Sequence, residues 1–272
     1  MRRKTTAVRI GNVVLSSEEP VLVQSMLNTS TREVDACVEQ AIRIIEAGGR
    51  LVRITAPGVK EAEMLGEIHR RLRERGYTTP ISADIHFVAE AASVAARYVE
   101  KVRINPGNFA DKRATFKKLT YTDEEYAAEL EILRQKFTEF LEVCRQYGTA
   151  VRIGTNHGSL SDRIMSRYGD TPAGMVEATM EYLRVCQACD FKDVVISLKS
   201  SDCRTMVDAV RLLVEKMEAE GMCYPLHLGV TEAGEGEDGR IRSAVGIGTL
   251  LNEGIGDTIR VYATSSGRVV PV

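Results

Sequence analysis

The sequence lacks tryptophan, holds only seven prolines and contains no long apolar run. Crossing a membrane requires about 18 consecutive apolar residues, and no segment approaches that length. The basic start at residues 1–4 is not followed by the apolar stretch that marks a secretory signal. We therefore expect a cytoplasmic protein that makes no membrane contact.

A large excess of charge of either sign is also absent. The 36 lysines and arginines nearly balance the 38 acidic residues, which gives a formal net charge of −2. A protein that binds nucleic acid through its overall charge needs a basic balance, so this composition excludes that class. Any affinity for anions must come from a local cluster of cations.

Six cysteines are too scattered to suggest a disulfide framework, and reduced thiols fit the expected compartment. They are Cys37, Cys144, Cys186, Cys189, Cys203 and Cys223. The spacing of Cys186 and Cys189 could supply half of a metal site, but it falls in a helix-like stretch with no second pair at ligand spacing. Packing explains these cysteines better, and we expect no metal site in this chain.

Apolar runs of strand length alternate with helix-like stretches, the first of which cover about 31–48, 58–76 and 86–97. The strand-like runs are 21–26, 50–55, 80–84, 99–104, 149–154, 193–198, 224–229 and 257–263. Eight such alternations in about 250 residues predict an α/β fold of the (β/α)8 TIM-barrel type. A doubly wound open sheet is the alternative.

Three segments modify this plan. Residues 1–18 contain AVRIGNVVLSS, which predicts a β-hairpin that could plug the bottom of the barrel. Residues 105–148 form an enlarged connection to the fifth strand, with an amphipathic helix at about 122–147. No helix-like run follows the last strand, so the final helix is expected to be missing or supplied from elsewhere. The length favours a single domain over 1–272.

The glycine-rich segment 231–244 follows the seventh strand and holds few bulky residues. Such connections are typical of a mobile lid or a substrate loop, and a plain solvated turn is the alternative. The neighbouring string GIGTLLNEGIGD at 246–257 lacks the third glycine of a dinucleotide loop and precedes a strand instead of following one. We reject a dinucleotide site there.

Four arginines interrupt strand-like runs that are otherwise apolar: Arg53, Arg103, Arg152 and Arg260. Burying a guanidinium without a partner is strongly unfavourable. In both candidate folds the functional groups gather at the carboxyl ends of the strands, and each arginine lies near the end of its run. The four side chains should therefore converge. Arg9 has the same Val-Arg-Ile setting in the hairpin, where it can simply face solvent, so the string alone proves little.

Lys199 follows the sixth strand and joins this set. Asp84 and Glu232 could neutralise part of it through internal salt bridges, which is the structural alternative. Five cations against two carboxylates leave an excess of about three charges, and their repulsion favours an anionic ligand. Arginine matches phosphate oxygens through paired hydrogen bonds, so a diphosphate ester is favoured. Asn156, Ser159 and the glycines of GTNHGSL could add donors.

Two histidines leave their roles open. His86 directly follows the third strand beside Asp84, where proton transfer, substrate orientation and helix capping all fit. His227 lies inside the seventh strand and could face the barrel interior or the outside.

Eight strings occur in order along nearly the whole chain: VQSMLNTST, LVRITAPG, ADIHF, VRINPGN, VRIGTNHGSLSDRIM, SLKSSD, PLHLGVTEAG and GIGTLLNEGIGDTIRV. They resemble the 4-hydroxy-3-methylbut-2-enyl diphosphate synthases of the methylerythritol phosphate route to isoprenoids. The long connection and the string GTNHGSLSDRIMSRYGDTPAGMVEA are most similar to the larger plant, chlamydial and Bacteroidetes form. That form carries an extra domain after the barrel.

The resemblance implies an oxidoreductase whose barrel binds 2-C-methyl-D-erythritol 2,4-cyclodiphosphate. A separate C-terminal domain would hold a four-iron four-sulfur cluster that opens the ring and removes a hydroxyl as water, using two electrons from ferredoxin or flavodoxin. The residues that match the family's diphosphate-binding set are Arg53, Arg103, Arg152, Asn156, Lys199 and Arg260. Glu232 would face the reacting carbons, and Asp84 and His86 would be further catalytic residues at the mouth.

The sequence departs from the family pattern in two places. None of the six cysteines matches the family's cluster cysteines, so this chain alone should bind the diphosphate without turning it over. Tyr262 stands where the family usually has a serine that contacts the diphosphate.

Two other functions remain as alternatives. A pterin-binding barrel of the dihydropteroate synthase or methyltransferase kind shares the overall layout. A non-catalytic module that binds a phosphorylated metabolite would fit the missing cluster segment.

Overall fold

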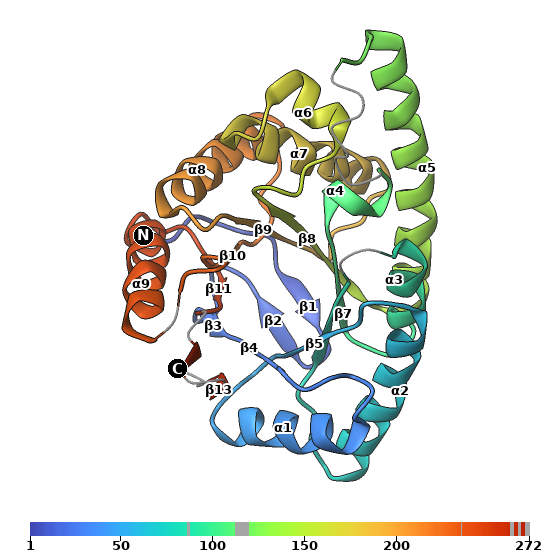
Figure 1. The fold of residues 1–272 in the computed structure, drawn as a ribbon, viewed down its shortest axis with the longest axis vertical. Helices are drawn as coiled ribbons and strands as arrows, with labels where there is room; N and C mark the ends of the chain where they lie inside the picture. The colour runs from blue at the N-terminus through green and yellow to red at the C-terminus, as the bar shows by residue number, and fades with distance from the viewer. Residues whose placement is uncertain (86–87, 112–119, 235, 262–263, 266–267, 270–272) are drawn as a thin grey trace.

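The computed structural model describes residues 1–85, 88–111, 120–234, 236–261, 264–265 and 268–269. Their parallel strands form a central barrel that is surrounded by helices (Figure 1). The barrel strands are β3 Leu22–Val23 with β4 Ser25–Met26, β5 Val52–Thr55, β6 Ile81–Asp84, β7 Lys101–Ile104, β8 Ala150–Asn156, β9 Val194–Lys199, β10 His227–Leu228 and β11 Thr258–Ile259. Each of the predicted strand-like runs overlaps at least one of these strands, which confirms the strand assignment.

The sheet closes on itself. Strands β4 to β9 pair in sequence order, and β10, β11 and β3 pair in a second parallel set. A parallel bridge between Ile196 and Leu226 joins the two sets on one side, and the Ile196 N–H donates to the Pro225 carbonyl over 3.0 Å. On the other side, β3 and β4 are halves of one strand interrupted only at Gln24. A closed barrel, not the open sheet, is therefore the correct alternative.

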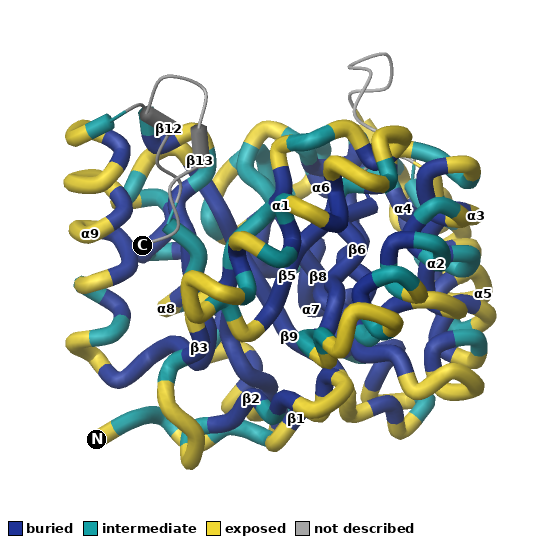
Figure 2. Tube along the Cα trace, turned by 90° about the horizontal axis from the view of Figure 1, so that it is seen from below, coloured by how far each residue is buried: buried dark blue, intermediate teal, exposed yellow. Residues whose placement is uncertain are grey.

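The helices pack around the barrel with one face inward. They are α1 Val34–Glu46, α2 Val59–Glu74, α3 Ala89–Ala95, α4 Pro106–Phe109, α5 Asp123–Tyr147, α6 Asp162–Tyr168, α7 Pro172–Ala188, α8 Cys203–Ala219 and α9 Gly236–Asn252. Figure 2 shows the barrel strands buried and the helices exposed on their outer faces. The main apolar core lies between these two layers. None of the described helices has both the length and the apolar character to cross a bilayer.

The N-terminal hairpin closes the amino end of the barrel, as its sequence predicted. Strands β1 Val8–Ile10 and β2 Val13–Leu15 pair antiparallel around a turn at Gly11, whose φ is 56°. Their inward apolar side chains form a separate small core with Leu22, Leu51, Ala150 and Val195 from the lower barrel. Arg9 points outward and is exposed, so the same tripeptide that is buried in the barrel faces solvent here.

The prediction of a loop at 231–244 is wrong for most of its length, because α9 begins at Gly236. The helix buries Gly239, Ser243, Gly246 and Ile247, which recur at helical spacing. A Cβ on Gly246 would come within 2.8 Å of Met206 and 2.9 Å of Val230. The small residues therefore serve close packing against α8, and this packing overrides the low helix propensity of glycine.

The long connection contains α5, whose bounds agree with the amphipathic helix predicted at about 122–147. Thr122 and Glu125 form a capping box at its start, and Gly148 ends it with a φ of 67°. The basic stretch at 112–119 lies outside the described residues. After β11, the described residues form a short antiparallel pair, β12 Thr264–Ser265 and β13 Arg268–Val269.

A buried ionic network fixes α5 and α6 against α7. Arg163 donates to Glu181 over 2.6 Å and to Asp111 over 2.9 Å, and the Tyr126 hydroxyl donates to the same glutamate. The Arg163 guanidinium also lies 4.6 Å from the centre of the Tyr126 ring. Glu181 thus links three helices.

Replacing this glutamate should destabilise the protein strongly. We expect Glu181→Gln to lower the free energy of unfolding in urea by about 3 kcal/mol, near the low end for a broken buried ion pair, because Asp111 still contacts Arg163. Glu131→Gln, at an exposed pair on α5, is the control and should change stability by less than about 0.5 kcal/mol. Equal stability of the two variants would contradict the assigned role.

Candidate anion-binding site

The interior of the barrel is charged instead of apolar. Along β5, β7 and β8, alternate side chains such as Val52, Val102 and Ile153 enter the outer core, while the arginines between them face inward. Arg53 and Arg103 are 3% exposed and Arg152 is 1% exposed. The sequence placed these arginines near the carboxyl ends of their strands, but they lie deeper in the barrel. Arg152, for example, is the third of seven residues in β8.

Asp84, at the end of β6, gathers these three arginines. It pairs with Arg53, lies 3.1 Å from Arg152 Nη2 and lies 3.6 Å from Arg103 Nη1. Arg152 also donates to Ser197 over 2.7 Å, and Arg103 donates to the Gly154 carbonyl over 2.8 Å. The prediction that arginines from separate strands converge is confirmed for this trio. A single carboxylate cannot neutralise three guanidinium groups, so positive charge remains in excess among these four side chains.

Two further cations adjoin the trio. Lys199 ends β9 and is buried, and Arg260 follows β11 and is half-buried. Burial, followed by the charges of Arg53, Arg152 and Arg260, lowers the pKa of Lys199 well below its ordinary value. Burial and the Arg53 charge likewise lower the pKa of Arg152. A guanidinium nevertheless stays protonated in proteins, so an anion placed here would relieve a strong repulsion.

Two glycines make room for these side chains: Gly154 in β8 and Gly229 directly after β10. A Cβ on Gly154 would lie 2.6 Å from Arg103 Nε and 3.0 Å from Arg152 Nη1. A Cβ on Gly229 would lie 3.2 Å from Lys199 Nζ and 2.9 Å from the Arg260 carbonyl oxygen. The cations can approach one another only because these positions carry no side chain.

The other predicted site residues occupy different surroundings. Asn156 ends β8 opposite Lys199 in the strand register and is half-buried. Glu232 is exposed in the loop after β10 and has a φ of 49°, a left-handed conformation that is uncommon for a side chain of this kind. His86 and Tyr262 lie outside the described residues.

The loop after β8 is less open to an anion than its sequence suggested. The Gly158 N–H donates to Asp170 over 3.0 Å, and the Ser159 hydroxyl accepts a hydrogen bond of 2.8 Å from Asn105. Both groups are therefore engaged within the protein.

Sequence reasoning missed Lys101 and left His227 undecided, and both face the interior. Lys101 begins β7 and is 0% exposed, and His227 in β10 is 1% exposed. Burial, followed by the Lys199 and Arg152 charges, lowers the pKa of His227 well below its ordinary value. The signal for Lys101 was available, because it lies two residues before Arg103 and must share its face of the strand.

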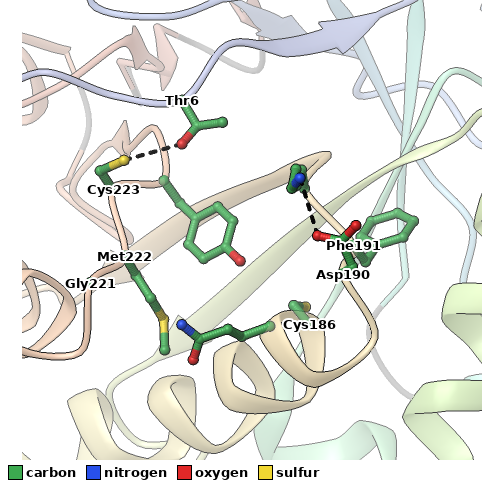
Figure 3. A pocket seen from close by; sticks show the side chains of 10 residues that line it. Thr6, Cys186, Asp190, Phe191, Gly221, Met222 and Cys223 are labelled. Atoms are coloured by element: carbon green, nitrogen blue, oxygen red, sulfur yellow. Dashed lines mark hydrogen bonds and ion pairs between the residues drawn. The ribbon is translucent and has the colours of Figure 1, made fainter.

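Two pockets lie outside this cluster. One, of about 640 Å³, is lined by residues 27–32 with Thr55, Pro57 and Glu61, so it opens at the carboxyl ends of β4 and β5. The other, of about 220 Å³, is lined by Thr6, Cys186, Asp190 and Met222 among others (Figure 3). These residues precede β9 and β10, so this second pocket lies at the opposite, amino end of the barrel.

The cysteines do not assemble a metal site in the described part of the chain. No three Cys, His, Asp or Glu side chains there have an arrangement that could hold a metal ion. Cys186 is buried, and the Cys223 thiol lies 3.2 Å from the Thr6 hydroxyl (Figure 3). The described residues therefore do not fit an iron–sulfur cluster.

Solved structures confirm the fold. A type I 3-dehydroquinate dehydratase from Clostridium difficile superimposes with a TM-score of 0.58 at 9% identity, covering 96% of this chain and 91% of that one. A dihydropteroate synthase from Xanthomonas albilineans gives a TM-score of 0.55 at 14% identity, covering 94% and 92%. At such low identity the likeness extends to the barrel and not to its ligand.

Sequence relatives are far closer. The chain is 64% identical over 260 residues to the 4-hydroxy-3-methylbut-2-en-1-yl diphosphate synthase (flavodoxin) of Parabacteroides distasonis, covering 96% of this chain and 43% of that protein. It is 52% identical over 264 residues to the chloroplastic, ferredoxin-type enzyme of Arabidopsis thaliana, covering 97% and 36%. The chain thus spans less than half the length of these relatives. A family model for the GcpE TIM-barrel domain matches residues 5–269, and the chain belongs to the GcpE family.

Proposed function

We propose that this chain is the substrate-binding barrel of a 4-hydroxy-3-methylbut-2-en-1-yl diphosphate synthase and that it binds 2-C-methyl-D-erythritol 2,4-cyclodiphosphate. The observation that carries the proposal is the cluster of Arg53, Arg103 and Arg152 around the single carboxylate Asp84. The family and the names of the relatives supply the activity, and the cluster supplies a physical reason for an anionic substrate.

The proposed ligand fits the charge of the site. Each phosphorus of the cyclic diphosphate has one ester link to carbon and one anhydride link to the other phosphorus, which leaves one negative charge per phosphate. Two charges would therefore enter a cavity with several buried guanidinium groups. Buried guanidinium groups form strong, directional hydrogen bonds with phosphate oxygens. The proposed diphosphate-binding residues are Arg53, Arg103, Arg152, Asn156, Lys199 and Arg260.

The barrel's own residues would bind and orient the ring. Asp84 holds the three arginines in place before the ligand arrives, so little rearrangement is needed on binding. Glu232 stands in the loop at the same end of the barrel, and we propose that it faces the reacting carbons. We assign Asp84 and His86 to the same mouth as further catalytic residues.

The reductive half of the reaction would depend on other parts of the protein. Ring opening with loss of a hydroxyl as water consumes two electrons, which flavodoxin or ferredoxin would deliver, as the names of the relatives suggest. The proposed four-iron four-sulfur cluster needs ligands that the described residues do not assemble. We therefore place it in a different domain, and we propose a cytoplasmic location for the protein.

A non-catalytic module that only binds the phosphorylated metabolite is the second candidate, since the described residues assemble no cluster ligands. Product formation after addition of a separate cluster domain and an electron donor would exclude it. The pterin-binding alternative loses its support, because the likeness to dihydropteroate synthase extends to the fold alone.

Removal of one buried guanidinium should weaken binding of the cyclodiphosphate. We expect Arg152→Met to raise the dissociation constant about 10- to 100-fold in isothermal titration, which corresponds to the loss of one or two charged hydrogen bonds. Arg9→Met, which changes the same tripeptide on the exposed hairpin, should bind like the wild type. No heat at millimolar ligand with the wild-type protein would refute the proposed function.

Filling the space at Gly154 should also weaken binding. The added methyl group of Gly154→Ala would overlap Arg103 and displace Arg152, so we expect about a tenfold loss of affinity. Gly248→Ala is the matched control, because a Cβ there has no neighbour within 4 Å and lies on α9. That variant should bind normally and should be slightly more stable in urea. Normal binding by Gly154→Ala would show that the spacing of the guanidinium groups is unimportant.

A further inference from the structure

Lys101 is a buried amine that the proposed binding set does not use. It begins β7 at the amino end of the barrel interior, two residues before Arg103, with Ser82 and Ala150 as its register neighbours. Its side chain is fully buried, and its Nζ has no hydrogen-bond partner among the described residues. A buried ammonium without an acceptor is strongly disfavoured.

The charged groups around Lys101 are mostly cations. Arg53 of β5, Arg152 of β8, Asp84 of β6 and His227 of β10 interact with it electrostatically. Asp84 is the acid in this set, and it already pairs with three arginines. Burial, followed by the Arg152 and Arg53 charges, lowers the pKa of Lys101 well below its ordinary value.

We propose that binding of the cyclic diphosphate is coupled to proton uptake by Lys101, which is a neutral amine in the empty barrel and an ammonium in the complex. The inference rests on the proposed function. The step is a simple protonation: one solvent proton joins the amine nitrogen, and no bond of the ligand forms or breaks. Lys101 therefore acts without contacting the ligand. Its protonation changes the net charge of the site from the amino end of the barrel interior.

The physical cause is the weaker positive field around Lys101 once the ligand is bound. In the empty barrel the guanidinium groups repel a proton on Lys101, and two negative charges bound among them would attract it. Linkage makes the effect reciprocal, so protonation of Lys101 must also tighten binding. Affinity should therefore rise as the pH falls through the higher pKa of the complex and should level off below the lower pKa of the empty protein.

Isothermal titration can count the protons directly. The wild-type chain is titrated with 2-C-methyl-D-erythritol 2,4-cyclodiphosphate at one pH in buffers of different ionisation enthalpy. Each phosphate of this ligand is substituted twice, by one ester and one anhydride link, so neither keeps a group that titrates near neutral pH and the ligand itself takes up no proton there. We expect an uptake of about one proton per ligand bound. Lys101→Met should lose most of this uptake, and Lys60→Met, at an exposed lysine of α2, should keep it.

The outcomes separate this inference from the function on which it rests. No heat at millimolar ligand overturns both. Binding whose heat is the same in all buffers overturns proton coupling alone. Full proton uptake by a folded Lys101→Met variant assigns the proton to another group, such as Lys199, and overturns the role of Lys101.

Unfolding of the unliganded protein provides a second test, which requires no ligand. A lysine whose pKa is depressed in the folded state binds more protons after unfolding, so stability should rise with pH up to the ordinary lysine pKa of about 10.4. Lys101→Met should reduce this slope by the contribution of one lysine. An identical slope in a folded Lys101→Met variant would contradict a neutral Lys101.

Discussion

Asp84 contacts guanidinium groups from three different strands, and the whole interior of the barrel depends on this contact. Without a shared anion the three buried arginines would repel one another in a medium that screens charge poorly. With it, they are held in fixed positions and still retain a net positive charge. The same carboxylate therefore stabilises the folded cluster and leaves it the positive charge on which the proposed binding of an anion depends.

The outward and inward side chains of the barrel strands have different roles. The outward side chains of the strands pack with the helices in the main apolar core. The inward side chains include Arg53, Lys101 and His227, which contribute charge or polarity instead of packing. Because the outer layer supplies most of the apolar burial, the interior can hold unfavourable charges that a smaller fold could not tolerate.

The strands and the arginine trio could be predicted from the sequence. Apolar runs that alternate with helix-like stretches indicate parallel strands, and an arginine within such a run indicates a buried charge that needs a partner. Prediction from the sequence failed where local propensity and tertiary packing disagree. The glycines of α9 indicate a loop when considered alone, but Gly246 is required against Met206 and Val230. Lys101 escaped notice because a lysine at the start of a strand usually reaches solvent, and only closure of the barrel shows that this one cannot.

The hairpin at the amino end has a consequence for how the chain folds. Val8 and Ile10 are synthesised well before some of the residues that bury them, which include Ala150 and Val195. Barrel closure similarly waits for Thr258, which pairs with Leu22. Such distant contacts slow folding, and they leave the apolar side chains of the hairpin exposed until Val195 has emerged from the ribosome. The hairpin that closes the amino end of the barrel is thus made long before the last of the strands that bury it.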